Sequence, residues 1–85
     1  MGMVEQGCGI RRGDRVVIEG SAEERKHVGK VWEVVIFDPW PTGDGTMLAK
    51  IALVGVPESE WVESETYYGG YACHFLRVIR APDGC

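Results

Sequence analysis

The residues that most restrict the fold of this chain are the nine from 38 to 46, which read DPWPTGDGT and include two prolines, two glycines and two aspartates. Proline fixes its own φ angle and lacks a backbone N–H donor, so it interrupts an α-helix. Glycine and aspartate are among the residues that tight turns use most. The segment therefore excludes a helix here and predicts a tight connection or a protruding hairpin loop.

Extended segments are predicted on both sides of this connection. Residues 28–37, VGKVWEVVIF, precede it and are rich in the β-branched and aromatic side chains that favour strands. Residues 47–55 follow it, and their alternation assigns to the core face Met47, Ala49, Ile51 and Leu53. The same criteria predict further strands at residues 14–19, 61–68 and 76–80.

Two other segments are predicted to turn. Residues 20–27, GSAEERKH, are polar and charged, and Ser21 and Glu24 have the spacing of a capping box, which allows one helical turn. Gly69 and Gly70 permit a sharp reversal after the fourth strand. Residues 71–75, YACHF, then read as a short turn before the last strand.

Five short strands and at most one helical turn predict an all-β domain. A closed or nearly closed barrel is the arrangement that leaves the fewest free strand edges at this size. A chain of 85 residues can form one domain with one core. We expect that domain to span residues 13–80, between an N-terminal segment at 1–12 and a C-terminal tail at 81–85.

The order of these segments carries a resemblance. Gly13, Asp14 and Val16 begin the first strand, and Gly29 and Val31 precede the core of the second. This pattern resembles the KOW-type sequence of SH3-like barrels in small bacterial proteins, and the resemblance covers residues 13–80. It implies a five-stranded SH3-like barrel, but not an activity, because this architecture hosts many functions.

The overall composition argues against several classes of protein. A net charge of −4 opposes non-specific attraction to nucleic acid and to an anionic membrane. The longest apolar run, residues 51–56, is far shorter than the roughly 20 residues that span a bilayer, so we expect no membrane partner. The N-terminal residues lack the features of a signal peptide, which favours the cytoplasm. Three cysteines without the paired spacings of zinc or redox motifs predict free thiols, with a Cys8–Cys73 disulfide as the alternative if the first and last strands are neighbours. We expect no cofactor.

Aromatic residues give the strongest indication of a function. Three tryptophans and three tyrosines are too many for the core of so small a barrel, even when Trp32 and Tyr68 fill it. Trp40 lies in a proline-bounded loop and is the best single candidate for a contact residue. We therefore expect a non-enzymatic module that binds a protein partner, or a second copy of itself, through Trp40, Trp61, Tyr67, Tyr71, Asp38 and Asp44.

Two alternative functions remain open from the sequence. KOW modules contact RNA or protein through basic loop residues, so the resemblance implies a possible nucleic-acid surface made of Arg11, Arg12, Arg15, Lys26 and Lys30. A small enzyme with a site at a subunit interface would instead combine Tyr71, His74 and Glu65.

Cys73 and His74 are the residue types that form a nucleophile and its base. Neighbours in an extended chain point to opposite faces, so we expect a buried thiol and a partly exposed imidazole instead of a catalytic pair. A zinc site would need ligands from a set without regular spacing: Cys8, Cys73, His74, Cys85 and His27. We therefore expect no catalytic residue and no metal ligand.

Overall fold

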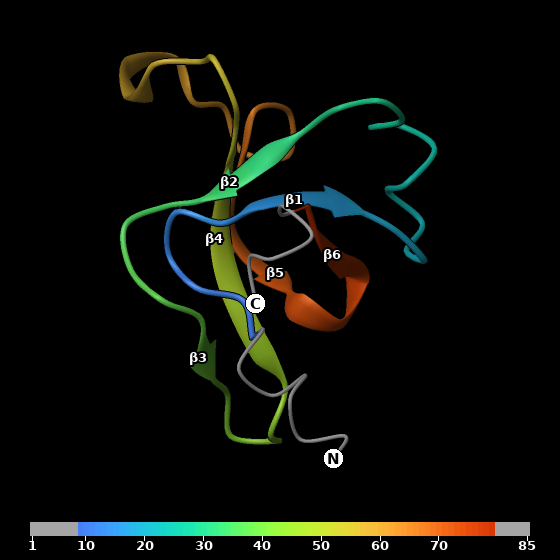
Figure 1. Ribbon diagram of the computed structural model, residues 1–85, viewed down its shortest axis with the longest axis vertical. Helices are drawn as coiled ribbons and strands as arrows, with labels where there is room; N and C mark the ends of the chain where they lie inside the picture. Colours follow the sequence, from blue (N-terminus) through green and yellow to red (C-terminus); the bar gives the residue numbers. More distant parts are fainter. Residues whose placement is uncertain (1–8, 80–85) are drawn as a thin grey trace.

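The computed structural model describes residues 9–79 and confirms the all-β class (Figure 1). No α-helix occurs in this range, and two short 3₁₀ turns connect strands, η2 at Glu58–Glu60 and η3 at Cys73–Phe75. No helix in the same range is long and apolar enough to cross a membrane. The strands are β1 Arg15–Ile18, β2 Trp32–Val34, β3 Trp40–Pro41, β4 Met47–Leu53, β5 Tyr67–Ala72 and β6 Leu76–Ile79.

The six strands form one antiparallel sheet, in which the pairing order is β3-β4-β2-β1-β6. Strands β2 and β3 pair with one edge of β4, and β5 pairs with its other edge. In Figure 1, β4 follows the long axis of the molecule and β1 lies across it. Closure of this sheet into a five-stranded barrel is not confirmed, because the described strands leave the sheet open. The additional strand is β3, which comes from the proline-rich connection and pairs with the start of β4, so the predicted hairpin is confirmed.

The core lies on the inner side of the sheet. Trp32 and Tyr68 are buried there, as predicted, and so are Ala49 and Ile51 of β4. Met47, predicted on the same face, is 40% exposed because it lies at the hairpin end of the strand. The remaining buried members of the core cluster are Val16, Ile18, Val34, Tyr71 and Leu76.

The fourth predicted strand is wrong in its position. Residues 61–66 form a loop that includes Ser64 with a φ of 70°, and β5 begins only at Tyr67. The strand continues through Gly69 and Gly70, where a reversal was predicted. These two residues lie between the pairs Ala49↔Tyr71 and Ile51↔Tyr68, opposite the single residue Lys50.

This arrangement is a β-bulge, and it decides where two tyrosines point. Tyr68 and Tyr71 are three residues apart, so a regular strand would place them on opposite faces. The extra residue of the bulge shifts the alternation, and both side chains enter the core, 7% and 8% exposed. A Cβ added at Gly70 would lie in ordinary van der Waals contact with Leu48 Cδ1, at 3.5 Å, and with the ring of Trp40, at 3.9 Å.

The second predicted strand, 28–37, is shorter than expected. Val28 is 72% exposed in the preceding loop, and β2 ends at Val34. Phe37 N–H donates to the carbonyl of Val35 at 2.8 Å, which closes a three-residue turn around Ile36. Ile36 has a φ of 74°, a strained backbone conformation for a β-branched residue. The turn leaves Ile36 and Phe37 48% and 45% exposed.

The charged loop at 20–27 contains the predicted turn of helix-like hydrogen bonds. Ser21 Oγ accepts the N–H of Glu23 at 3.2 Å, and Glu24 N–H donates to the Ser21 carbonyl at 3.1 Å. The Glu24 carboxylate accepts the N–H of Gly20 at 2.8 Å, one residue earlier than in a standard capping box. These bonds hold the loop in one turn without extending it into an α-helix.

A buried chain of polar groups fastens this loop to the sheet. His27 is 3% exposed, and its Nε2 lies 2.7 Å from the hydroxyl of Tyr68. Because the Tyr68 hydroxyl donates to Glu23 Oε1 at 3.0 Å, we assign the proton to Nε2 of His27. Nδ1 is then the acceptor facing the ammonium of Lys30 at 3.4 Å. The arrangement therefore requires a neutral imidazole.

The surroundings of His27 agree with this assignment. Burial lowers the pKa of His27 first, the positive charges of Lys30 and Lys26 lower it further, and only Glu23 opposes them. Burial and Glu23 raise the pKa of the Tyr68 hydroxyl, which remains a donor. A proton added at Nδ1 would face the Lys30 ammonium, so protonation weakens the attachment of the loop.

We expect stability to fall on mild acidification. The pKa of His27 is lower in the folded than in the unfolded chain, where it is about 6.5. The unfolded state therefore binds more protons below that pH, and the unfolding free energy decreases as the pH falls from about 7 to about 5. Urea unfolding at several pH values measures this slope. His27→Gln should reduce the slope and the exposed-site control His74→Gln should retain it; equal slopes in both variants would contradict the assignment.

The strained turn predicts a stabilising substitution. Ile36→Gly removes the Cβ penalty at a φ of 74° and loses little burial, so the unfolding free energy should rise by about 1 kcal/mol. The comparison is Val62→Gly, which removes a similarly exposed side chain at a position without a positive φ and should not stabilise. Denaturant unfolding of the wild type and the two variants measures these changes in unfolding free energy. A loss of stability in Ile36→Gly would show that the turn is not strained.

Candidate functional site

The outer side of the sheet carries most of the aromatic residues that do not fill the core. Ala49 and Ile51 face the core, so Leu48, Lys50 and Ala52 of β4 face the opposite side. Ala52 lies outside the core cluster and is still only 3% exposed, which means that neighbouring side chains cover this side as well. Tyr67 pairs with Ala52 and Trp40 with Leu48, so these two side chains lie on this side. Together with their ring partners and Lys50 they form a group that we call the outer aromatic face: Phe37, Trp40, Lys50, Trp61 and Tyr67.

One end of the outer aromatic face combines two rings with a cation. Phe37 and Trp40 meet edge to face, with ring centroids 5.3 Å apart. The ammonium of Lys50 lies 5.7 Å from the Phe37 centroid and 5.8 Å from that of Trp40, within the range of cation–π attraction. Lys50 also donates to the carbonyl of Gly69 at 3.1 Å. These contacts fix the orientation of the rings.

The other end is a stacked pair. The rings of Trp61 and Tyr67 lie nearly parallel, with centroids 4.9 Å apart and planes 4° apart. The indole N–H of Trp61 donates to the carbonyl of Val56 at 3.1 Å. Both side chains remain partly exposed, so the pair is ordered and still accessible.

The predicted acidic residues Asp38 and Asp44 support turns. Asp38 Oδ1 accepts the backbone N–H of Arg12 at 2.8 Å. Asp44 accepts the hydroxyl of Thr42 and, at 3.0 Å, the N–H of Thr46. These hydrogen bonds, the Thr42 bond first, lower the pKa of Asp44 to about 2, so its carboxylate is ionised at neutral pH.

Tyr71 is placed differently from the sequence expectation. It is 8% exposed, and its hydroxyl lies 2.6 Å from Ser21 Oγ, so it joins β5 to the 20–27 loop. It does not lie on the outer aromatic face. The glycine bulge described above is the reason, because it turns this side chain inward.

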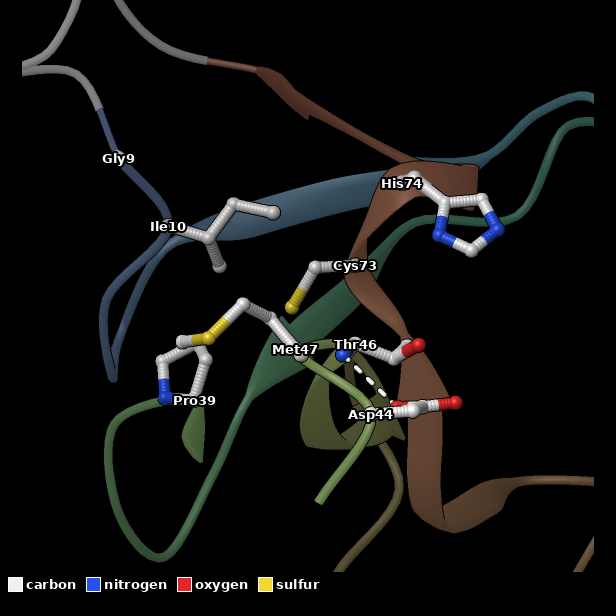
Figure 2. Close-up of a pocket in the computed structure, with 9 residues that line it drawn as sticks. Gly9, Ile10, Pro39, Asp44, Thr46, Met47, Cys73 and His74 are labelled. Atoms are coloured by element: carbon white, nitrogen blue, oxygen red, sulfur yellow. Dashed lines mark hydrogen bonds between the residues drawn. The ribbon is translucent and has the colours of Figure 1, made fainter. Parts of the chain in front are cut away.

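A pocket of about 680 Å³ lies between the β3–β4 hairpin, η3 and Gly9–Ile10 (Figure 2). Its walls are mainly apolar, with Ile10, Pro39 and Met47 facing the sulfur of Cys73. The His74 ring points away from that sulfur in Figure 2, as predicted for neighbouring residues. Burial raises the pKa of the Cys73 thiol, which opposes its activation as a nucleophile.

The residues proposed for an interface enzyme are spread over separate places. Tyr71 is in the core, His74 lines the pocket, and Glu65 lines a different hollow beside Lys26 and Lys30. No group of three His, Cys, Asp or Glu side chains that could hold a metal occurs between residues 9 and 79. Of the predicted zinc set, His27 belongs to the buried polar chain, and Cys8 and Cys85 lie outside the described residues.

The basic residues proposed for nucleic acid also divide into groups. Arg11 and Arg12 border a hollow with residues 36–38. Lys26 donates to the Ser64 carbonyl at 2.9 Å, and Lys30 contacts His27. Arg15 lies opposite Glu33 in the register of β1 and β2.

Two members of the outer aromatic face were not predicted as site residues. Lys50 could have been found from the alternation in residues 47–55, which already places it opposite the core face. Phe37 could not, because its position depends on the turn at Ile36.

Cys73 should behave as an unreactive thiol. In the variant Cys8→Ser/Cys85→Ser, which leaves one cysteine, its alkylation by iodoacetamide at pH 7.5 should be slower than that of glutathione, because burial raises its pKa. The rate should continue to rise above pH 9 as the thiolate forms. An alkylation rate at pH 7.5 that equals or exceeds the glutathione rate would contradict this assignment.

Comparisons of the chain with models of protein families, with curated proteins and with solved structures found no match. A function must therefore be argued from the geometry of the chain itself.

Proposed function

We propose that this protein is a non-enzymatic interaction domain that binds a protein partner through its outer aromatic face. The observation that carries the proposal is that four rings are held in fixed orientations on the side of the sheet opposite the core. Tryptophan and tyrosine contribute most to interface energies, because they bury a large area with little loss of rotamer freedom. A preordered aromatic face is suited to that role.

The side-chain contacts described above support this use. Lys50 orders the Phe37–Trp40 end, and the Val56 carbonyl orders Trp61, so little conformational entropy remains to be lost on binding. Val62 is 50% exposed beside the second pair, and Ile36 and Phe37 are nearly as exposed beside the first. These apolar side chains extend the surface available to a partner at both ends.

We further infer that the sheet belongs to the SH3-like barrel class with a KOW-type first hairpin. Support comes from the last strand, β6, which follows the 3₁₀ turn η3 and returns to pair with β1. The first and last described strands are therefore neighbours, as a barrel requires. The cytoplasmic location expected from the sequence is part of the same proposal.

The net charge of the chain favours a partner that is a different protein over a second copy of this chain. The chain carries a net charge of −4, and two copies would repel one another at long range. Self-association through the aromatic face remains the measurable alternative, and sedimentation velocity of the purified protein distinguishes it.

The proposal predicts that capture of a protein partner depends on Trp40 and Trp61. Tagged wild type, Trp40→Ala, Trp61→Ala and the control Val28→Ala are incubated with nuclease-treated lysate of the source organism, and bound proteins are quantified by mass spectrometry. Val28 is 72% exposed in the loop before β2, and Val28→Ala is the control truncation of an apolar side chain away from the outer aromatic face. A specific protein should bind wild type and Val28→Ala, and its recovery should fall at least fivefold with both tryptophan variants.

Two results would contradict the proposal. One is a nuclease-resistant partner that all four baits recover equally, which would place the interface elsewhere. The other is binding that is found only in a parallel lysate without nuclease, which would direct attention to Arg11, Arg12 and Arg15 and to nucleic acid.

A further inference from the structure

We propose that the partner presents an arginine side chain to the Trp61–Tyr67 pair, where its guanidinium meets the carboxylate of Glu63. This inference rests on the proposed function, because it names the chemistry of the partner that the outer aromatic face binds. Two features carry it: an aromatic pair fixed in advance, and neighbouring carboxylates that lack an ion-pair partner in the described chain.

The aromatic pair is arranged for a planar cation. Its rings are parallel within 4° and remain partly exposed. The indole hydrogen bond to Val56 holds Trp61, and pairing with Ala52 of β4 holds the backbone of Tyr67. A cation close to an aromatic face is attracted by the ring quadrupole, and rings that are already ordered lose little entropy on contact.

Glu63 brings negative charge to the same place. Its backbone forms an isolated parallel β-bridge with Tyr67. The N–H of Gly69 donates to its carboxylate oxygens, at 3.3 Å to Oε1 and 3.4 Å to Oε2. A Cβ added at Gly69 would lie 3.6 Å from Glu63 Oε1 and 3.7 Å from the Tyr67 hydroxyl. The carboxylate and the edge of the tyrosine ring therefore converge above a residue that has no side chain.

The carboxylates near the pair form no ion pair in the described chain, and the nearby ammonium of Lys26 is bound to the carbonyl of Ser64. Within residues 9–79 the ion pair between charged groups is Arg77–Glu19, and Glu23 faces the neutral imidazole of His27. Glu58 and Glu60, exposed in η2 immediately before Trp61, also form no ion pair there. Their negative charge favours a basic segment of the partner.

The two ends of the outer aromatic face differ in this respect. At the Phe37–Trp40 end, the chain supplies its own cation through Lys50. At the Trp61–Tyr67 end, the described residues supply carboxylates and no cation–π contact. A cation from the partner would give the Trp61–Tyr67 pair the ring–cation contact that Lys50 already makes with Phe37 and Trp40.

Arginine fits this place better than lysine. Its guanidinium is planar, stacks on aromatic rings and can pair with a carboxylate through two parallel hydrogen bonds. A second copy of this chain is disfavoured as the donor, because it would bring a net charge of −4 toward an acidic surface.

The test is an NMR titration of ¹⁵N-labelled protein with a capped Gly-Arg-Gly-Arg-Gly peptide. The control peptide replaces arginine by citrulline, which keeps the shape of the side chain without its charge. The arginine peptide should shift the indole N–H resonance of Trp61 and leave that of buried Trp32 unchanged. Equal shifts with the citrulline peptide, or a response confined to other parts of the protein, would overturn the proposal.

Matched variants locate the charge. Glu63→Gln should weaken binding of the arginine peptide about fivefold, the effect of one exposed ion pair. Glu65→Gln makes the same charge change in the same loop, beside Lys26 and Lys30, and should change binding less than twofold. Equal effects of the two substitutions would overturn the assignment to Glu63.

The lysate experiment separates this inference from the proposed function. A protein lost with Trp61→Ala and retained undiminished by Glu63→Gln would leave the interaction function standing and overturn the arginine contact. Absence of any protein that depends on the aromatic face would overturn the proposed function itself. A captured protein that both variants lose, and whose binding weakens with added salt, supports both.

Discussion

Strand β4 is paired along both edges, and the two sides of the molecule depend on this constraint. Ile51 pairs with Val34 of β2 and with Tyr68 of β5, so β4 cannot rotate without breaking both ladders. Its alternation then sends Ala49 and Ile51 into the core and Lys50 outward between aromatic rings. The core and the proposed binding face are thus two consequences of one strand register.

The glycine bulge in β5 adapts the neighbouring strand to that register. It lets Tyr68 and Tyr71 face the core together. Their hydroxyl groups then contact the 20–27 loop, Tyr68 at His27 and Tyr71 at Ser21. A loop rich in charged residues is in this way held by buried polar contacts. The cost of burying these groups is offset because each has a hydrogen-bond partner, which also makes the attachment sensitive to protonation of His27.

The arguments about function follow from what the core does not use. Trp32, Tyr68 and Tyr71 are sufficient for the interior, which leaves Phe37, Trp40, Trp61 and Tyr67 on the outer side. Cys73, by contrast, has the surroundings of an inert thiol at the wall of an apolar pocket. The outer side therefore combines ordered rings, the ammonium of Lys50 and carboxylates without an ion pair among the described residues, and our proposal of a binding surface rests on this combination.

Features governed by neighbouring residues could be predicted from the sequence. The prolines and glycines of 38–46 predicted a tight connection or a hairpin, Ser21 and Glu24 a single turn, and period-two alternation the inward positions of Ala49 and Ile51. Long-range pairing decided the rest. Whether Gly69 and Gly70 reverse the chain or form a bulge depends on their register against Lys50, about twenty residues away, and this register buries Tyr71. The meeting of Phe37 with Lys50, and of Trp61 with Tyr67 and Glu63, likewise arises only when the strands assemble, because local preferences do not fix how separate segments pack.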